Sequence, residues 1–198
     1  NNVQITGSNN NDNLTGTCEI PGSVVIDGVT YTVVSIGDNA FIGSQFEQLF
    51  LPTTITSIGN SAFKDVTTLT RVTYRTISTV ETIGSNAFQN TSINEVIVPI
   101  TMTSIGAGAF SNIGTLTFLS FTPERSVDMT MTIGDTAFKS TAFTSVSFPN
   151  TVTSIGSEAF ADIPNLRMIG VHKHTVLSKD SLPNTNTYMN TSTFSRLS

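Results

Sequence analysis

The chain repeats one six-residue frame, Ile-Gly-x-x-Ala-Phe, six times. The copies begin at Ile36, Ile58, Ile83, Ile105, Ile133 and Ile155, so the steps between them are 22, 25, 22, 28 and 22 residues. A period of this length is typical of a solenoid, in which each repeat is a coil that buries its apolar face by stacking on its neighbours. The frame therefore predicts one elongated repeat domain.

The frame also predicts how each coil turns. The residue after the glycine is Asp, Asn or Ser in five of the six copies, which are good helix N-caps, so a short α-helical or 3₁₀ turn is expected to start there. The Ala and Phe then point into the coil. The recurrent glycine indicates either a positive φ or a close backbone approach between coils. The six frame phenylalanines are expected to form a ladder through the core.

A second pattern follows each frame, an apolar triplet with the spacing L-x-x-L-x-L. Its last two members alternate, as in a strand with one buried face. Stacked coils would join these strands into one parallel sheet, with a strand spacing of roughly 4.8 Å. The triplets are Phe46/Leu49/Leu51, Leu69/Val72/Tyr74, Ile93/Val96/Val98, Leu116/Leu119/Phe121, Phe143/Val146/Phe148 and Leu166/Ile169/Val171.

The residues beside the triplets should point outward, where side chains can meet a partner. One outward column is Gln48, Arg71, Glu95, Phe118, Ser145 and Met168, and the next is Phe50, Thr73, Ile97, Ser120, Ser147 and Gly170. Apolar side chains at such positions form either a partner site or singly scattered surface residues. The candidate binding residues are Phe50, Arg71, Glu95, Ile97, Phe118 and Met168.

The return segment leads from each triplet to the next frame. It carries an apolar residue three positions before the frame isoleucine in every copy except the fifth, where Thr130 stands there, so a shifted register is expected at that coil. The longer returns, 75–82 and 122–132, both belong to even copies, which suggests that pairs of coils were duplicated. Their charges, Arg75, Glu124, Arg125 and Asp128, could flank the outward columns.

The ends of the chain depart from the repeat. Residues 1–35 are predicted to be a polar leader followed by an N-terminal cap, a β-hairpin around Asp27-Gly28. Residues 17–21 resemble a degenerate half-repeat. Residues 36–178 hold the six repeats, and residues 179–198 are either a C-terminal tail or a truncated next repeat.

Composition excludes several functions. Only 12% of the residues are charged, with 14 Asp and Glu against 9 Lys and Arg, so the basic footprint of a nucleic-acid-binding protein is missing. No apolar run reaches the ~18 residues of a membrane span. The single cysteine, Cys18, allows no intrachain disulfide and is expected to be buried or inert.

Catalytic and metal-binding constellations are also missing from the sequence. The two histidines, His172 and His174, have a spacing compatible with a metal, but neither a cysteine nor a carboxylate pair frames them. A solvated edge strand is the ordinary interpretation of this pair. The sequence therefore predicts no enzyme, no metal site and no cofactor.

The frame, the triplet followed by proline and the Thr/Ser-rich return of residues 53–57 resemble the BspA-type leucine-rich repeat. The resemblance covers about residues 29–178. It implies a right-handed α/β solenoid, mostly β, with one parallel sheet on one side and short helical turns opposite. It further implies an extracellular or cell-surface location in bacteria, although no signal peptide is present in this chain, and a role in adhesion to host extracellular-matrix proteins.

Two functions remain open at this point. The first is a non-enzymatic surface or secreted binding module that recognises a host protein or glycan through the outward strand face. The alternative is a structural spacer that displays another domain and has no ligand of its own. The sequence leaves the oligomeric state open.

Overall fold

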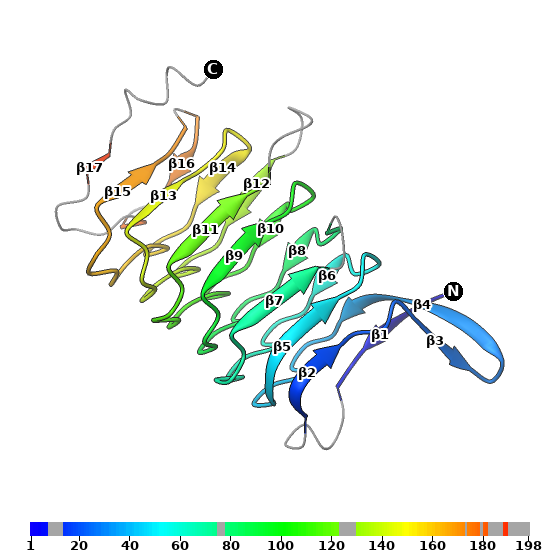
Figure 1. The fold of residues 1–198 in the computed structure, drawn as a ribbon. Coiled ribbons are helices and arrows are strands. Elements are labelled where there is room, and N and C mark those ends of the chain that lie inside the picture. The colour runs from blue at the N-terminus through cyan, green and yellow to red at the C-terminus, as the bar shows by residue number, and fades with distance from the viewer. Residues whose placement is uncertain are drawn as a thin grey trace.

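The computed structural model is an elongated stack of coils (Figure 1). It describes residues 1–7, 14–74, 78–122, 130–172, 174–178, 180–181 and 188–189. Within the stack, the strands that pair between neighbouring coils run parallel to each other. The solenoid predicted from the repeat is therefore confirmed.

The strands that end in the frame isoleucines form one continuous sheet, here called the frame sheet. Each frame isoleucine pairs with its equivalent in the next coil, from Ile36 to Ile155. In spatial order its strands are β1 (Asn2–Ile5), β4 (Val29–Ile36), β6 (Ser57–Ile58), β8 (Thr82–Ile83), β10 (Ser104–Ile105), β12 (Met131–Ile133), β14 (Val152–Ile155) and β16 (Val176–Leu177).

The triplets form a second row of strands, and we call the outward side of this row the strand face. The row consists of three separate parallel sheets, with the orders β2-β5-β7, β9-β11 and β13-β15-β17. Its strands are β2 (Thr15–Glu19), β5 (Gln45–Leu51), β7 (Arg71–Tyr74), β9 (Glu95–Val98), β11 (Phe118–Phe121), β13 (Ser145–Ser147), β15 (Met168–Gly170) and β17 (Tyr188–Met189).

The expectation of a single sheet is therefore wrong. Several strands of the frame sheet are only two residues long, which is too short for an alternating pattern to reveal them in the sequence. The two breaks in the triplet row follow β7 and β11, where the longer returns 75–82 and 122–132 leave the even coils. The breaks thus group the six copies in pairs, the first with the second, the third with the fourth and the fifth with the sixth, as a duplication of coil pairs would.

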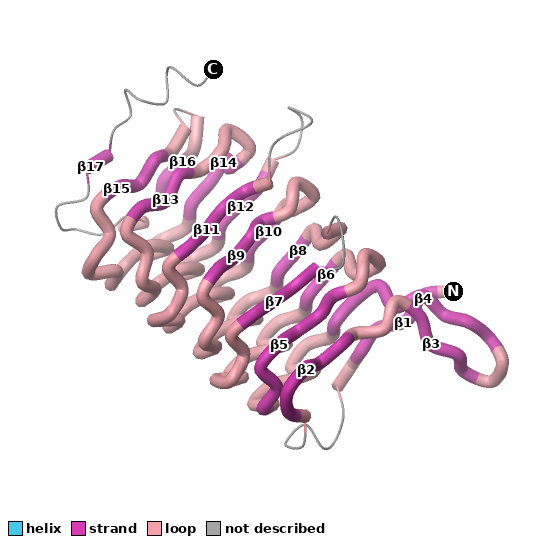
Figure 2. The backbone as a smooth tube through the Cα atoms, viewed as in Figure 1, coloured by secondary structure: helices cyan, strands magenta, loops and turns pink. Residues whose placement is uncertain are grey.

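The expectation of short helical turns at the frame is also wrong. The described residues contain strands and turns but no helix (Figure 2). Two residues in each of the six frame copies, four positions apart, have a left-handed backbone instead, as Asn86 (φ 56°) and Asn90 (φ 60°) do in the third copy. A left-handed residue ends a right-handed helix at once, so the segment cannot continue as one.

Hydrogen bonds to the neighbouring coil alternate here with bonds that span three residues within the turn, such as that from the N–H of Ala40 to the carbonyl of Gly37. The N–H of Asn39 donates to the carbonyl of Asn60 (2.9 Å), and the N–H of Phe41 donates to the carbonyl of Ala62 (2.7 Å). The residue expected to act as an N-cap serves the next coil, because Asp135 Oδ1 accepts from the N–H of Ser157 at 2.7 Å. The polar turn residues therefore hold the stack together.

The frame glycine allows neighbouring coils to approach closely. At Gly156 an added Cβ would lie 2.5 Å from the backbone N of Asp135, and at Gly84 it would lie 2.6 Å from the backbone N of Asn60. None of the six frame glycines has a positive φ. Of the two reasons that the sequence offers for the glycine, the close approach is the correct one.

The frame phenylalanines stack on one another through the core, which confirms the predicted ladder. Successive ring centroids lie 5.3, 5.1, 5.3, 5.4 and 5.3 Å apart. The shifted register predicted in the fifth copy is also present. Met131 takes the buried position there and pairs with Val152, and the register shifts between Met131 and Thr132.

Threonines at the coil corners add a second set of contacts between coils. Thr115 Oγ1 donates to the carbonyl of Ile93, and Thr153 Oγ1 donates to the carbonyl of Met131. Corner threonines of other coils also donate to a backbone carbonyl of the preceding coil. The high threonine content of the chain thus satisfies backbone carbonyls along the edges of the stack.

The N-terminal region joins the stack earlier than the sequence suggests. β1 lies beside β4 and β2 lies beside β5, with Ile5 opposite Ile36 and Cys18 opposite Leu49. The half-repeat predicted at residues 17–21 is thus confirmed in β2. Residues 2–5, predicted to belong to a loose leader, instead form a strand of this outermost coil.

The β-hairpin predicted around Asp27-Gly28 is present, formed by β3 (Ser23–Ile26) and β4. It leaves the side of the stack at the N-terminal end (Figure 1). β1 and β2, and not the hairpin, form the outermost coil, so the hairpin does not occupy the position expected of a cap.

The C-terminal region continues the coil geometry without a complete frame. Leu177 pairs with Ile155, and Asp180 has the left-handed backbone (φ 59°) that Glu158 has one coil earlier. β17 extends the triplet row beyond β15. No part of the chain that the structure describes forms a helix long and apolar enough to cross a membrane.

Candidate functional site

The strand face brings the candidate binding residues onto one side of the molecule. The strand register places Gln48 opposite Arg71, Glu95 opposite Phe118, and Ser145 opposite Met168. The neighbouring column pairs Phe50 with Thr73, Ile97 with Ser120, and Ser147 with Gly170. Both columns thus run across the triplet strands in the order predicted from the sequence.

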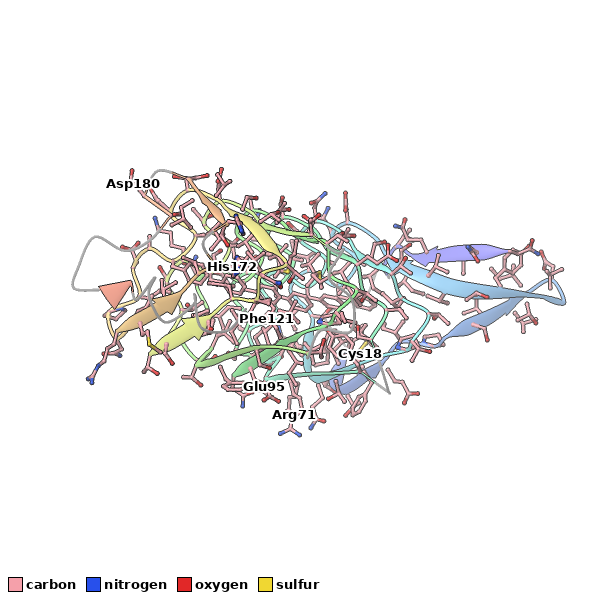
Figure 3. The ribbon with its side chains drawn as sticks, turned by 90° about the horizontal axis from the view of Figure 1, so that it is seen from above. Cys18, Arg71, Glu95, Phe121, His172 and Asp180 are labelled. Carbon is pink, nitrogen blue, oxygen red and sulfur yellow. The ribbon has the colours of Figure 1, made fainter. Side chains whose placement is uncertain are left out.

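Three of the apolar candidates are about half exposed. The exposed fractions are 44% for Ile97, 54% for Phe118 and 49% for Met168. Phe50 is partly buried, so it presents less surface to a partner. Arg71 and Glu95 are exposed and point away from the core on the side of the triplet strands (Figure 3).

Only two of the apolar candidates are neighbours. Ile97 lies on β9 and Phe118 on the adjacent strand β11, where Phe118 faces Glu95, two residues before Ile97. Met168 lies two strands further along the face, beyond Ser145. Phe50 lies on β5, with β7 between it and β9. The central sheet β9-β11 therefore carries the compact apolar pair, and the other two residues lie apart from it.

The central sheet is bordered on both sides by a break in the triplet row. The coils remain joined at the start of these strands, where the N–H of Ser92 donates to the carbonyl of Leu69 (2.9 Å) and that of Ala142 to the carbonyl of Leu116 (3.0 Å). The strands themselves are not paired across either break. The loop charges expected to flank this surface, Arg75, Glu124, Arg125 and Asp128, lie outside the described residues.

The two histidines do not lie on a strand, so their assignment to an edge strand is wrong. They follow β15 in a turn, with their ring centroids 5.2 Å apart. His172 Nδ1 is buried without a hydrogen-bond partner among the described residues, and His174 is exposed. Within the described ranges, no three His, Cys, Asp or Glu side chains gather closely enough to hold a metal ion.

Cys18 faces the core from β2. Burial raises the pKa of its thiol to about 11, because the charged thiolate is poorly solvated there. The thiolate is the reactive form of cysteine, so Cys18 is suited to packing and not to nucleophilic chemistry at neutral pH.

One exposed apolar cluster is missed by the sequence predictions. Val25, Ile26 and Val29 at the tip of the β3-β4 hairpin are 68%, 48% and 42% exposed. A hairpin is predicted there because both arms are rich in β-branched residues. The sequence gives no signal for this exposure, because a stretch whose only charge between Gly22 and Ser35 is Asp27 is typical of a buried segment.

Comparison with known proteins identifies the repeat. Residues 34–167 and 131–198 match the BspA type leucine rich repeat region, in 6 copies. A comparison with curated proteins gave no match.

Solved structures with the same fold come from several bacteria. The pneumococcal vaccine antigen PcpA has a TM-score of 0.69 at 20% identity, over 86% of this chain and 43% of PcpA. A leucine rich cell surface protein from Faecalibacterium prausnitzii has a TM-score of 0.56 at 28% identity, over 78% of this chain and 46% of that protein. The leucine-rich repeat protein TpLRR of T. pallidum has a TM-score of 0.52 at 24% identity, over 85% of this chain and 70% of TpLRR. The chain thus spans less than half the length of the first two.

Proposed function

Because the chain belongs to the BspA-type leucine-rich repeat family, we propose that it is a non-enzymatic binding module of a bacterial cell-surface or secreted protein. It recognises a host protein or glycan through the strand face. The observation that carries this proposal is the pair Ile97 and Phe118, two large apolar side chains on adjacent strands that are 44% and 54% exposed.

The physical argument concerns what an apolar pair on an outward strand position does for the protein. The alternating pattern places Val96 and Leu119 of the same strands in the core, so Ile97 and Phe118 contribute little to folding. Aromatic residues are enriched among the side chains that dominate binding energy at interfaces. Glu95, opposite Phe118, and Arg71, on β7 of the preceding coil, supply charged groups that can form the polar rim of such a contact.

The proposed location rests on the related structures. The protein from F. prausnitzii is described as a cell surface protein, and PcpA as a vaccine antigen. Extracellular display of this chain would give the strand face access to host matrix proteins and to mucin glycans.

Binding of the purified chain to immobilised matrix proteins and mucin glycans tests the proposal. We expect saturable binding to at least one of them, and a loss of about tenfold or more in affinity for Phe118→Asp, because a charge at the centre of an apolar contact remains unpaired. The matched control is Ile42→Asp, which changes an apolar residue that is 40% exposed but lies in a turn away from the strand face.

Two results would contradict this function. One is the absence of saturable binding to every matrix protein and glycan tested. The other is an equal loss of affinity in the Phe118 and Ile42 variants, which would show that the strand face has no special role.

A structural spacer is the second candidate, and the continuous frame sheet favours it. That sheet runs through every described coil, and the phenylalanine ladder runs parallel to it, as expected of a stiff rod. For a spacer, Phe118→Asp would leave binding by the full-length protein unchanged. Deleting one pair of coils would instead shorten the reach of whatever the rod carries, which a cell-adhesion assay across a fixed gap can measure.

A further inference from the structure

The β3-β4 hairpin extends from the side of the stack (Figure 1), and a two-residue turn joins its two strands at the tip. Asp27 and Gly28 have φ values of 50° and 78°, as a type I′ turn requires. Ile26 faces Val29 and Val24 faces Tyr31 across the hairpin. The tip is therefore a regular antiparallel ribbon and not an irregular loop.

One edge of β3 is open among the strands that the structure describes. β3 pairs with β4 on one side, and no described strand pairs with its other side. In a hairpin with a two-residue turn, the residues that flank the turn bond to each other, so Ile26 and Val24 direct their N–H and C=O groups toward β4. Ser23 and Val25 direct theirs toward the open edge.

This edge lacks the usual protection against pairing. Edge strands in natural proteins commonly carry lysine, proline or an inward-pointing charge that blocks a second strand. The segment 22–33 contains neither lysine nor proline, and Asp27 in the turn is its only charge. Val25, on the open edge, is 68% exposed and Ile26 is 48% exposed.

We propose that the occupant of this edge is the same edge of a second copy of the chain. The two β3 strands pair antiparallel around a two-fold axis, with Val25 of one copy opposite Val25 of the other. This contact is isologous, because each copy contributes the same residues. It goes beyond the proposed function, since it uses no residue of the strand face.

Self-complementarity is the reason to choose a second copy over an unrelated strand. The register centred on Val25 places Val24 opposite Ile26 of the second copy, so apolar side chains meet on one side of the new ladder. It also brings Ser23 to the end of the ladder, where the second copy turns at Asp27, so that a hydroxyl group lies near a carboxylate. The two Asp27 side chains are four residues apart along the ladder, roughly 13 Å, which keeps the like charges separate.

The contact is small, which determines how it should be measured. A pair of four-residue strands buries less surface than the interface of a stable dimer, so the association is weak and depends on concentration. The hairpin extends away from the coils (Figure 1), so the β3 edges of two copies can meet.

Sedimentation equilibrium over a range of protein concentrations tests the proposal. We expect a reversible monomer–dimer equilibrium for the unchanged chain and a monomer at every concentration for Val25→Lys. The matched control is Val176→Lys, since Val176 is a strand valine with a similar exposure (66%) at the other end of the frame sheet. This control is expected to dimerise like the unchanged chain.

Cross-linking tests the register independently of the stability of any lysine variant. Directly opposed, hydrogen-bonded residues of an antiparallel pair have Cα atoms about 5.5 Å apart, within the range that a disulfide spans. Val25→Cys is therefore expected to give a covalent dimer on mild oxidation. Val176→Cys is expected to give none, and neither is the unchanged chain, in which Cys18 is buried.

The proposal is overturned if the unchanged chain is a monomer at all concentrations. It is equally overturned if Val25→Lys still dimerises, or if Val176→Lys abolishes the dimer, because the contact would then lie elsewhere. A Val25→Cys variant that does not cross-link would contradict the two-fold register.

Discussion

Phe110 illustrates what a frame residue does for this protein. Its ring stacks on Phe88 at 5.3 Å and on Phe138 at 5.4 Å, and it is 2% exposed. Both stacking partners come from other coils, so the energy of each ring is shared between neighbours. Phe118 is the same residue type eight positions later, yet it is 54% exposed, which makes the two residues a natural pair for comparison.

Replacing Phe110 with alanine is expected to lower the free energy of unfolding by about 3–5 kcal/mol, because a cavity replaces a ring that is packed on both sides. Phe118→Ala is the control, with an expected change within about 0.5 kcal/mol for an exposed position. Urea denaturation followed by circular dichroism measures both. If the two variants lost similar stability, the ladder would not be the main support of the stack.

Cys18 gives a prediction for the dependence of stability on pH. Burial raises the pKa of its thiol from 9.0 for the solvated side chain to about 11 in the folded state, so the folded protein retains this proton after the unfolded chain has lost it. The resulting contribution to the free energy of unfolding is fully present below pH 9 and is lost as the pH rises toward 11.

Cys18→Ala is therefore expected to flatten the fall in unfolding free energy between pH 9 and pH 11, relative to the unchanged chain. Chemical denaturation at several pH values in that interval measures the effect. Identical slopes for the two proteins would show that the thiol ionises freely while the protein is folded.

At the scale of the element, the turn after each frame glycine shows where sequence-based prediction fails. An Asp, Asn or Ser after glycine is a good N-cap, so the sequence favours a helical turn there. The left-handed residues at Asn86 and Asn90 prevent a helix, and the side chain of Asp135 bonds to the next coil. The helix-capping preference of a residue is judged from its own segment, so it cannot show that the side chain accepts a hydrogen bond from another coil.

Predictions at this scale succeed when the signal is repeated or strictly local. The stacked phenylalanines, the row of triplet strands and the shifted register at Met131 all follow from comparing one coil with the next. The hairpin follows from Asp27-Gly28 alone. The two-residue strands of the frame sheet are too short to give an alternating pattern in the sequence. The exposure of Ile97 and Phe118 follows from the alternation of the triplet strands. Their role in binding remains a prediction.

The approach of neighbouring turns can be tested at the glycines. Gly156→Ala should destabilise the protein by about 1–3 kcal/mol, because its Cβ would lie 2.5 Å from the backbone of Asp135 and the coils would have to separate. Gly114→Ala is the matched control, since nothing lies within 4 Å of a Cβ at that position. Thermal unfolding of both variants measures the difference, and equal melting temperatures would contradict the close approach.

At the scale of the whole molecule, the described residues of each coil form their strand pairs and backbone hydrogen bonds with the adjacent coils. The frame sheet passes through all of the described coils, whereas the triplet row is divided into three sheets. Stability in such a stack is approximately the sum of the stabilities of single coils and of the contacts between neighbours. The stack is therefore not expected to behave as one uniform core.

Hydrogen exchange should reveal this organisation. We expect the slowest exchange in the coils around Phe88 and Phe110, and faster exchange toward both ends, because an end coil has one neighbour instead of two. Phe110→Ala should accelerate exchange first in its own coil and the two adjacent ones. Uniform acceleration from residue 14 to residue 172 would instead indicate a single cooperative unit.

The frame glycine has a further consequence for how such proteins change in length. Each coil meets the next through the same atoms: a glycine against a backbone, a phenylalanine on a phenylalanine, an isoleucine beside an isoleucine. A gene duplication that inserts one more pair of coils therefore creates interfaces that already exist elsewhere in the protein. Evolution can lengthen this molecule without first inventing a new contact, while the residues of the strand face remain free to diverge in every copy.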